Sequence, residues 1–118
     1  MNLRDDGGQI GMDLQISFRN MHSSDFLQGF IEEKSQTFSK YFNGRMILKW
    51  TISAEKLGKV VHAQLVGNHM DYFAEANTSD FRGSIEQVIQ KLERQIRKHK
   101  EILKDHLHKS KTTEKLSA

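Results

Sequence analysis

The residues with the clearest chemical potential are basic side chains crowded toward the C-terminal end of the chain. From Lys91 to Lys111 there are eight Lys or Arg residues and three acids, a net charge of +5, whereas the other ten basic and twelve acidic residues give −2. A guanidinium presents a planar fork of N–H donors and an ammonium a compact charge, and both bind phosphate oxygens. This end of the chain therefore predicts contact with a polyanion. The candidate phosphate-binding residues are Lys91, Arg94, Arg97, Lys98, Lys100 and Lys104.

The basic residues indicate what kind of polyanion is recognised. Phosphate contacts give affinity and orientation but carry no information about base sequence. The chain shows no helix-turn-helix pattern that would place a recognition helix in the major groove of DNA. The pattern therefore favours recognition of folded RNA by its shape over base-specific recognition of DNA.

Catalytic and metal-binding patterns are missing from the sequence. It contains no cysteine, so disulfides and thiolate chemistry are excluded. It also lacks a G-x-S-x-G elbow, a phosphate loop, a G-x-G-x-x-G turn and an H-E-x-x-H helix. His106 and His108 lie about 200° apart around a helix, and neither His62 nor His69 has an acid at ligand spacing. We therefore expect no enzyme activity, no cofactor, no bound metal and no small-molecule substrate.

Aromatic residues on strands offer an alternative mode of RNA binding, because bases stack on exposed rings. Trp50 and Tyr72 fall on strand faces that we assign to the core, and Phe73 alone points outward, beside Glu75. Core packing is therefore the preferred interpretation for Trp50 and Tyr72. His99 lies on an apolar helix stripe, where we expect a partly buried, hydrogen-bonded histidine.

The size and composition of the chain limit what can position these residues. Its 118 residues, 36% of them hydrophobic, are enough for one domain with one core. No apolar run approaches the roughly 18 residues that are needed to span a bilayer. The first residues of the sequence are polar and lack the apolar stretch that is typical of a signal peptide. The lack of cysteine fits a reducing compartment. We expect a cytoplasmic protein without a membrane partner.

Four segments predict strands and one predicts a first helix. Apolar residues alternate with polar ones over 14–18, 48–52, 61–65 and 72–77, and short turns between the last three runs favour an antiparallel meander. Ser23, Ser24 and Asp25 supply N-cap chemistry for a helix that ends at Asn43-Gly44. The apolar residues of that helix, at helical spacing, are Phe26, Leu27, Phe30, Ile31, Phe38, Tyr41 and Phe42.

The last helix is predicted to carry the basic residues. Asp80 is its N-cap, and it runs from Phe81 to Lys109, about 45 Å. One apolar stripe follows it, made of Ile85, Val88, Ile89, Leu92, Ile96, His99, Leu103 and Leu107. The element order β-α-β-β-β-α predicts an α+β fold, a two-layer sandwich in which both helices cover one face of a four-stranded sheet. We expect a disordered lead-in over 1–11, the domain over 12–109 and a flexible tail over 110–118.

Two runs in the last helix carry a resemblance to a known family: Asp80-Phe81-Arg82-Gly83-Ser84-Ile85-Glu86 and Lys91-Leu92-Glu93-Arg94-Gln95-Ile96-Arg97-Lys98-His99-Lys100. Together with Ala74-Glu75-Ala76 and a first helix with Phe30, Lys34 and a closing Tyr41-Phe42, they resemble the ribosome hibernation-promoting factors, a family that includes the ribosome-associated inhibitor proteins. The resemblance covers Met12 to about His106.

The resemblance implies a function as well as the same fold. Members of that family bind the small ribosomal subunit in the mRNA and tRNA channel and block translation under stress or in stationary phase. By position, it implies RNA contacts at Lys34, Lys91, Arg94, Lys98, Lys100 and Lys104, to which we add Arg82 and Arg97 on the same helix. The implied partner is the small subunit with its rRNA, and we expect a monomer when the protein is free.

The sequence departs from the family pattern at a few positions. Gln28 and Thr37 stand where relatives often have basic residues, and Arg82 stands in place of a tyrosine. The sequence resembles a short form of the family, for which we expect neither the extra C-terminal domain nor the long acidic tail of other members. Two alternatives remain open: a generic double-stranded RNA-binding module, and a regulator of transcription whose basic helix meets an acidic protein.

Overall fold

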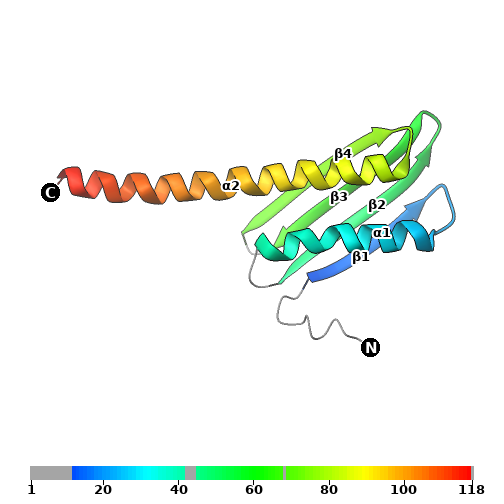
Figure 1. The fold of residues 1–118 in the computed structure, drawn as a ribbon, viewed down its shortest axis with the longest axis horizontal. Coiled ribbons are helices and arrows are strands. Elements are labelled where there is room, and N and C mark those ends of the chain that lie inside the picture. Colours follow the sequence, from blue (N-terminus) through cyan, green and yellow to red (C-terminus); the bar gives the residue numbers. More distant parts are fainter. Residues whose placement is uncertain (1–11, 42–44, 68, 118) are drawn as a thin grey trace.

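The protein is described by a computed structural model, in which residues 12–41, 45–67 and 69–117 are placed, with side chains as far as Lys100. Figure 1 shows a twisted sheet with two helices lying across one of its faces, and a last helix that continues well beyond the sheet. The elements are β1 (Met12–Arg19), α1 (Asp25–Ser35), the 3₁₀ helix η2 (Gln36–Tyr41), β2 (Met46–Glu55), β3 (Gly58–Gly67), β4 (Met70–Thr78) and α2 (Phe81–Ser117).

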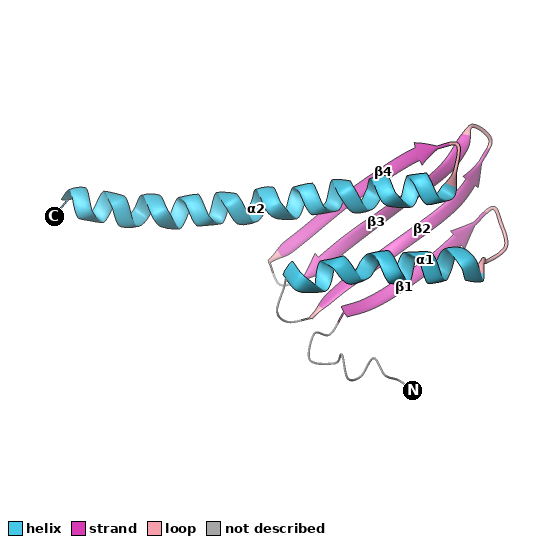
Figure 2. Ribbon diagram, in the orientation of Figure 1, coloured by secondary structure: helices cyan, strands magenta, loops and turns pink. Residues whose placement is uncertain are grey.

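The sheet has the strand order β1-β2-β3-β4. β1 pairs with β2 in parallel, because α1 carries the chain back across the sheet between them, and the β2–β3 and β3–β4 pairs are antiparallel. The register aligns Ile16, Trp50, Ala63 and Ala74 in one row across the four strands. This confirms the predicted α+β sandwich, with both helices on one face (Figure 2).

The core lies between this sheet face and the two helices. Trp50, Leu48 and Ile52 of β2 are buried, as predicted from their alternation with polar residues. The Trp50 indole N–H donates to the Ser35 hydroxyl at 3.2 Å, so the largest core side chain has no unsatisfied polar group. β1 alternates between half-buried and exposed residues, as expected for a strand at the margin of the helix layer.

The first helix differs from its predicted form in two respects. Ser24 is its N-cap and accepts from the Leu27 N–H at 3.1 Å, as expected, but the α-helix ends at Ser35 and a 3₁₀ helix follows. In a 3₁₀ helix residues three apart share a face, and this brings Ser35 and Phe38 together into the core. The predicted end at Asn43-Gly44 lies outside the described residues. Phe26, one of the apolar residues at helical spacing, is 62% exposed.

The last helix begins as predicted and ends later. Asp80 accepts from the Gly83 N–H at 2.9 Å and so caps α2, which continues to Ser117 rather than stopping at Lys109. After Gly83 the sequence contains no glycine or proline that would end a helix. The predicted end lay two residues beyond Leu107, the last residue of the apolar stripe, and the end of an apolar stripe does not by itself terminate a helix.

Candidate nucleic-acid interface

The N-terminal end of α2 is fixed to the sheet by a hydrogen-bonded serine. Ser84 is fully buried, and its hydroxyl donates to the Lys59 carbonyl oxygen at 2.6 Å and accepts from the Thr78 N–H at 3.1 Å. Farther along, Ile85, Val88, Ile89, Leu92 and Ile96 are buried, which confirms the predicted stripe over its described part. The direction of α2 is therefore set by packing before the helix leaves the sheet.

His99 connects α2 to the sheet near the end of the described side chains. Its Nδ1 is hydrogen-bonded to the Tyr72 hydroxyl, and the two rings meet edge to face with centroids 5.7 Å apart. Burial raises the pKa of the Tyr72 phenol above its ordinary value. A half-buried, hydrogen-bonded histidine was expected here, and the contact confirms it.

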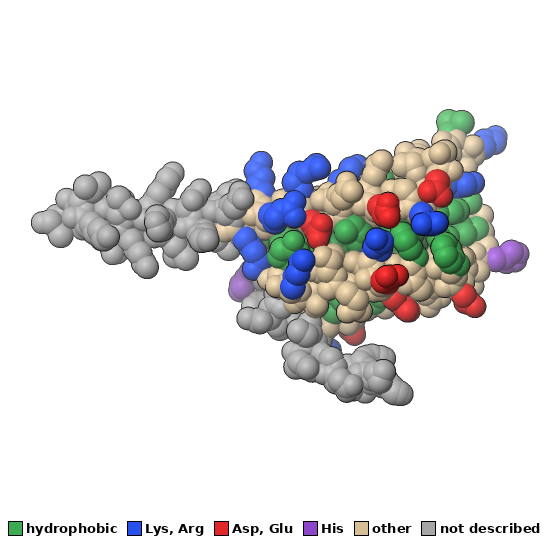
Figure 3. All heavy atoms as spheres, in the orientation of Figure 1, with side chains coloured by type: hydrophobic (Ala, Val, Ile, Leu, Met, Phe, Trp, Pro, Cys, Tyr) green, Lys and Arg blue, Asp and Glu red, His purple; other side chains and the backbone are tan. Residues whose placement is uncertain are grey.

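Arg94, Arg97 and Lys98 lie on the solvent side of α2 and are all exposed. They point about 130–170° away from the centre of the buried stripe. Among the described side chains the ion pair present joins Lys34 to Glu86, so no carboxylate neutralises these three cations. Figure 3 shows basic side chains gathered where α2 leaves the body of the molecule. Lys100 is also exposed at this end, whereas the side chain of Lys104 lies outside the described part.

Lys91 has a structural partner on the sheet. Its ammonium donates to the Glu75 carbonyl oxygen at 2.6 Å, and one turn on Gln95 donates to the Phe73 carbonyl oxygen at 2.7 Å. β4 is an edge strand, so these carbonyls have no neighbouring strand to pair with. Lys91 and Gln95 thus cover the edge of the sheet, and Lys91 is only half-exposed.

Lys34 and Arg82 lie apart from the exposed cations near the end of the described part of α2. The Lys34 Nζ is 3.8 Å from Glu86 Oε2, and the Arg82 guanidinium lies over the rings of Phe26 and Phe30 at 5.9 and 5.5 Å. Fifteen helical residues separate Arg82 from Arg97, or about 22 Å. The structure therefore brings Arg94, Arg97, Lys98 and Lys100 together and does not bring Lys34 and Arg82 to them.

Two basic residues at the same end were missed by the sequence analysis. Lys40, on η2, and Arg45, just before β2, are both exposed. η2 lies against α2 through a hydrogen bond from the Thr37 hydroxyl to Glu93 at 2.9 Å. Neither residue belongs to a basic run, and only the return of the chain to this end of the sheet reveals them. We call Lys40, Arg45, Arg94, Arg97, Lys98 and Lys100 the basic end.

The strand aromatics do not form a stacking platform. Trp50 is buried, which confirms its assignment to the core, and Tyr72 is held by His99. Phe73 is 51% exposed on the other face of the sheet, where its nearest ring partner is His62 at 5.4 Å.

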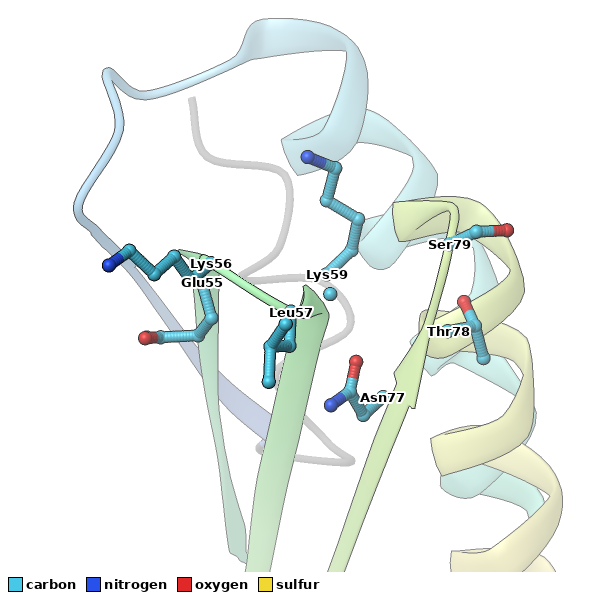
Figure 4. Close-up of a pocket in the computed structure, with 8 residues that line it drawn as sticks. Glu55, Lys56, Leu57, Lys59, Asn77, Thr78 and Ser79 are labelled. Atoms are coloured by element: carbon cyan, nitrogen blue, oxygen red, sulfur yellow. The ribbon is translucent and has the colours of Figure 1, made fainter.

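A shallow depression lies at the opposite end of the sheet from the basic end. Figure 4 shows its lining residues, which come from the β2–β3 turn and the link between β4 and α2. Its one acid, Glu55, accepts hydrogen bonds from the Ser53 hydroxyl and the Asn20 amide through a single carboxylate oxygen. Among the described residues no group of three His, Asp or Glu could hold a metal ion, and no helix is long and apolar enough to cross a membrane.

Known proteins are similar to this chain in sequence over most of its length. The ribosome hibernation promoting factor of Escherichia coli K12 is 30% identical over 95 residues, covering 80% of this chain and all of that protein. The protein of the same name from Azotobacter vinelandii is 29% identical over 90 residues, covering 76% of this chain and 84% of that one.

Solved structures share the fold. The N-terminal domain of Thermus thermophilus Protein Y has a TM-score of 0.68 at 18% identity, covering 75% of this chain and 99% of that one. A ribosomal subunit interface protein from Coxiella burnetii has a TM-score of 0.67 at 22% identity, covering 75% and 98%. The sequence model described as Sigma 54 modulation protein / S30EA ribosomal protein matches residues 14–104, from β1 into α2. The chain therefore belongs to this family, that of the ribosome hibernation promoting factors.

Proposed function

We propose that this protein is a ribosome hibernation factor that binds the small ribosomal subunit in its mRNA and tRNA channel and blocks translation under stress or in stationary phase. The observation that carries the proposal is the unneutralised set Arg94, Arg97 and Lys98 on a helix whose N-terminal half is locked to the sheet. The names of the relatives point to the same role, since they are ribosome hibernation promoting factors.

The proposed mechanism is steric exclusion and requires no chemical step. The basic end meets rRNA phosphates and releases their counterions, which supplies much of the affinity. Because α2 is rigid where it packs on the sheet, little conformational entropy is lost when its cations meet the RNA. A bound two-layer domain then occupies space that mRNA and tRNA need. The positive field of this end speeds the encounter.

The proposal is tested by sedimentation of the purified protein with ribosomal subunits on a sucrose gradient. We expect it to travel with the small subunit at low salt and to dissociate as salt rises. With six or more phosphate contacts, the affinity should fall by orders of magnitude between roughly 50 and 200 mM salt.

Other outcomes of the same experiment contradict the proposal. Preferential binding to free duplex RNA added as a competitor would make the chain a double-stranded RNA-binding module. Failure to bind either RNA would favour a regulator that contacts an acidic protein.

A further inference from the structure

An aromatic and cationic cluster lies between α1 and α2, away from the basic end. Phe26 and Phe30 are stacked with centroids 6.3 Å apart and planes 18° from parallel. The Arg82 guanidinium lies over both rings, and the Lys34 ammonium lies 5.3 Å from the centre of the Phe30 ring. We call Phe26, Phe30, Lys34 and Arg82 the aromatic platform. Phe26 is 62% exposed, although a phenylalanine at an apolar helix position is normally buried.

The surface beside Phe26 is open. Gly29 follows one turn later on α1, and a side chain built there would meet no heavy atom within 4 Å. Phe26 itself is 62% exposed, so part of its ring is accessible to another flat group. A residue of almost any other type at position 29 would project into the open space on this side of α1.

Arg82 is arranged so that its hydrogen-bond donors remain available. Cation–π contact uses the face of the guanidinium, whereas phosphate binding uses the N–H groups at its edge. Within the described side chains Arg82 belongs to no ion pair. The nearby acid Glu86 is paired with Lys34 and not with Arg82. Asp25, which precedes Phe26 in the first turn of α1, forms no ion pair with Arg82 among the described side chains. Two ring contacts hold the guanidinium in place and so reduce the entropy lost when it binds an anion.

We propose that the aromatic platform binds one unpaired nucleotide of the small-subunit RNA, with the base stacked on Phe26 beside Gly29 and a phosphate on the edge of Arg82. An exposed aromatic ring next to an arginine is the combination that recognises splayed-out bases in single-stranded RNA. This site lies about 22 Å along α2 from Arg97 and makes a second, separate contact. The inference rests on the proposed function, since it takes its RNA from that partner.

The test measures affinity of the full chain for isolated small subunits at fixed salt. Phe26→Ala should weaken binding about 5- to 150-fold, the range seen when a base loses its stacking partner. Phe26→Leu should lose a similar factor, because leucine keeps the apolar bulk but has no π face, and Phe26→Trp should preserve binding. The matched control is Phe73→Ala, which removes an exposed ring on the other face of the sheet and should change affinity less than about twofold.

Two further measurements separate binding from folding. Gly29→Leu favours the helix, because glycine is a poor helix former, yet fills the space beside Phe26. It should weaken subunit binding while the thermal midpoint is unchanged or higher. Ultraviolet cross-linking of the wild-type complex, followed by peptide mass spectrometry, should yield an RNA adduct on the peptide that contains Phe26.

Each contrary result has a distinct meaning. If the wild type binds small subunits and Phe26→Ala binds equally well, the platform proposal is overturned and the proposed function stands. If Phe26→Leu binds like the wild type while Phe26→Ala does not, the contact is with an apolar protein surface, and the nucleotide site is also overturned. If the wild type does not bind small subunits, both proposals fail together.

Discussion

Removal of the charge at Lys98 should lower the salt dependence of small-subunit binding, whereas removal of the charge at Lys91 should leave it nearly unchanged. Both residues are lysines on α2, seven positions apart, and both were predicted to contact RNA. The Lys98 side chain is exposed and has no ion-pair partner among the described residues. The Lys91 ammonium is held on the Glu75 carbonyl oxygen at the edge of β4.

The expected size of the effect follows from counterion release. Each phosphate neutralised on RNA contributes about 0.7–0.9 to the slope of log K against log salt concentration. Lys98→Gln should therefore reduce the slope by about that amount. Lys91→Gln should change the slope much less and should instead destabilise the fold by about 0.5–1.5 kcal/mol, through loss of its hydrogen bond to the sheet edge.

The assay is a titration of labelled protein with small subunits at several salt concentrations, accompanied by denaturant unfolding of each variant. The two substitutions change net charge equally, so a difference in slope reports contact and not the overall field. Equal loss of slope in the two variants would show that the Lys91 ammonium leaves Glu75 to meet RNA, and the assignment of Lys91 to the sheet edge would then be wrong.

Three further predictions concern the fold that positions the basic end. Leu92→Ala should lower the free energy of unfolding by about 2–5 kcal/mol, because Leu92 is fully buried. Denaturant unfolding measures this change, and a loss below about 1 kcal/mol would mean that another side of α2 faces the sheet. Ser84→Ala should lower the free energy of unfolding by about 1–3 kcal/mol, because it leaves the Lys59 carbonyl and the Thr78 N–H without this partner. Ser84→Thr should also destabilise the fold, because Ser84 is fully buried and the added methyl group would be crowded. Because the pKa of Tyr72 is raised in the folded state, folding stability should fall as pH rises above its ordinary value of 10.0, and Tyr72→Phe should remove that part of the alkaline loss.

The regular part of the fold could be predicted from the sequence because burial imposes a period on it. Trp50 and its neighbours on β2 alternate with polar residues, and Ile85 through Ile96 recur at helical spacing, so their faces were identifiable. The cap at Asp80 was predictable because its hydrogen bond is local. Such features depend on near neighbours in the chain.

Features set by distant segments could not be predicted in the same way. Phe26 and Leu27 are adjacent and equally apolar, but α1 turns only Leu27 into the core, since the position of α2 decides which side of the first helix is covered. The sequence of α2 alone does not distinguish Lys91 from Lys98. The carbonyl oxygen that binds Lys91 belongs to β4, an edge strand that lies beside α2 only in the folded protein. Lys40 and Arg45 join the basic end only once the chain is folded.

The central claim is that the basic end holds the protein in the path of mRNA and tRNA. The measurement that tests it most directly is inhibition of translation in a purified system, with the wild type compared with a variant in which Arg94 and Lys98 are both changed to Glu. We expect the wild type to inhibit, excess initiator tRNA and mRNA to relieve the inhibition by mass action, and the double reversal to abolish both small-subunit binding and inhibition. Inhibition that survives the double reversal, or that no excess of tRNA and mRNA relieves, would contradict the claim.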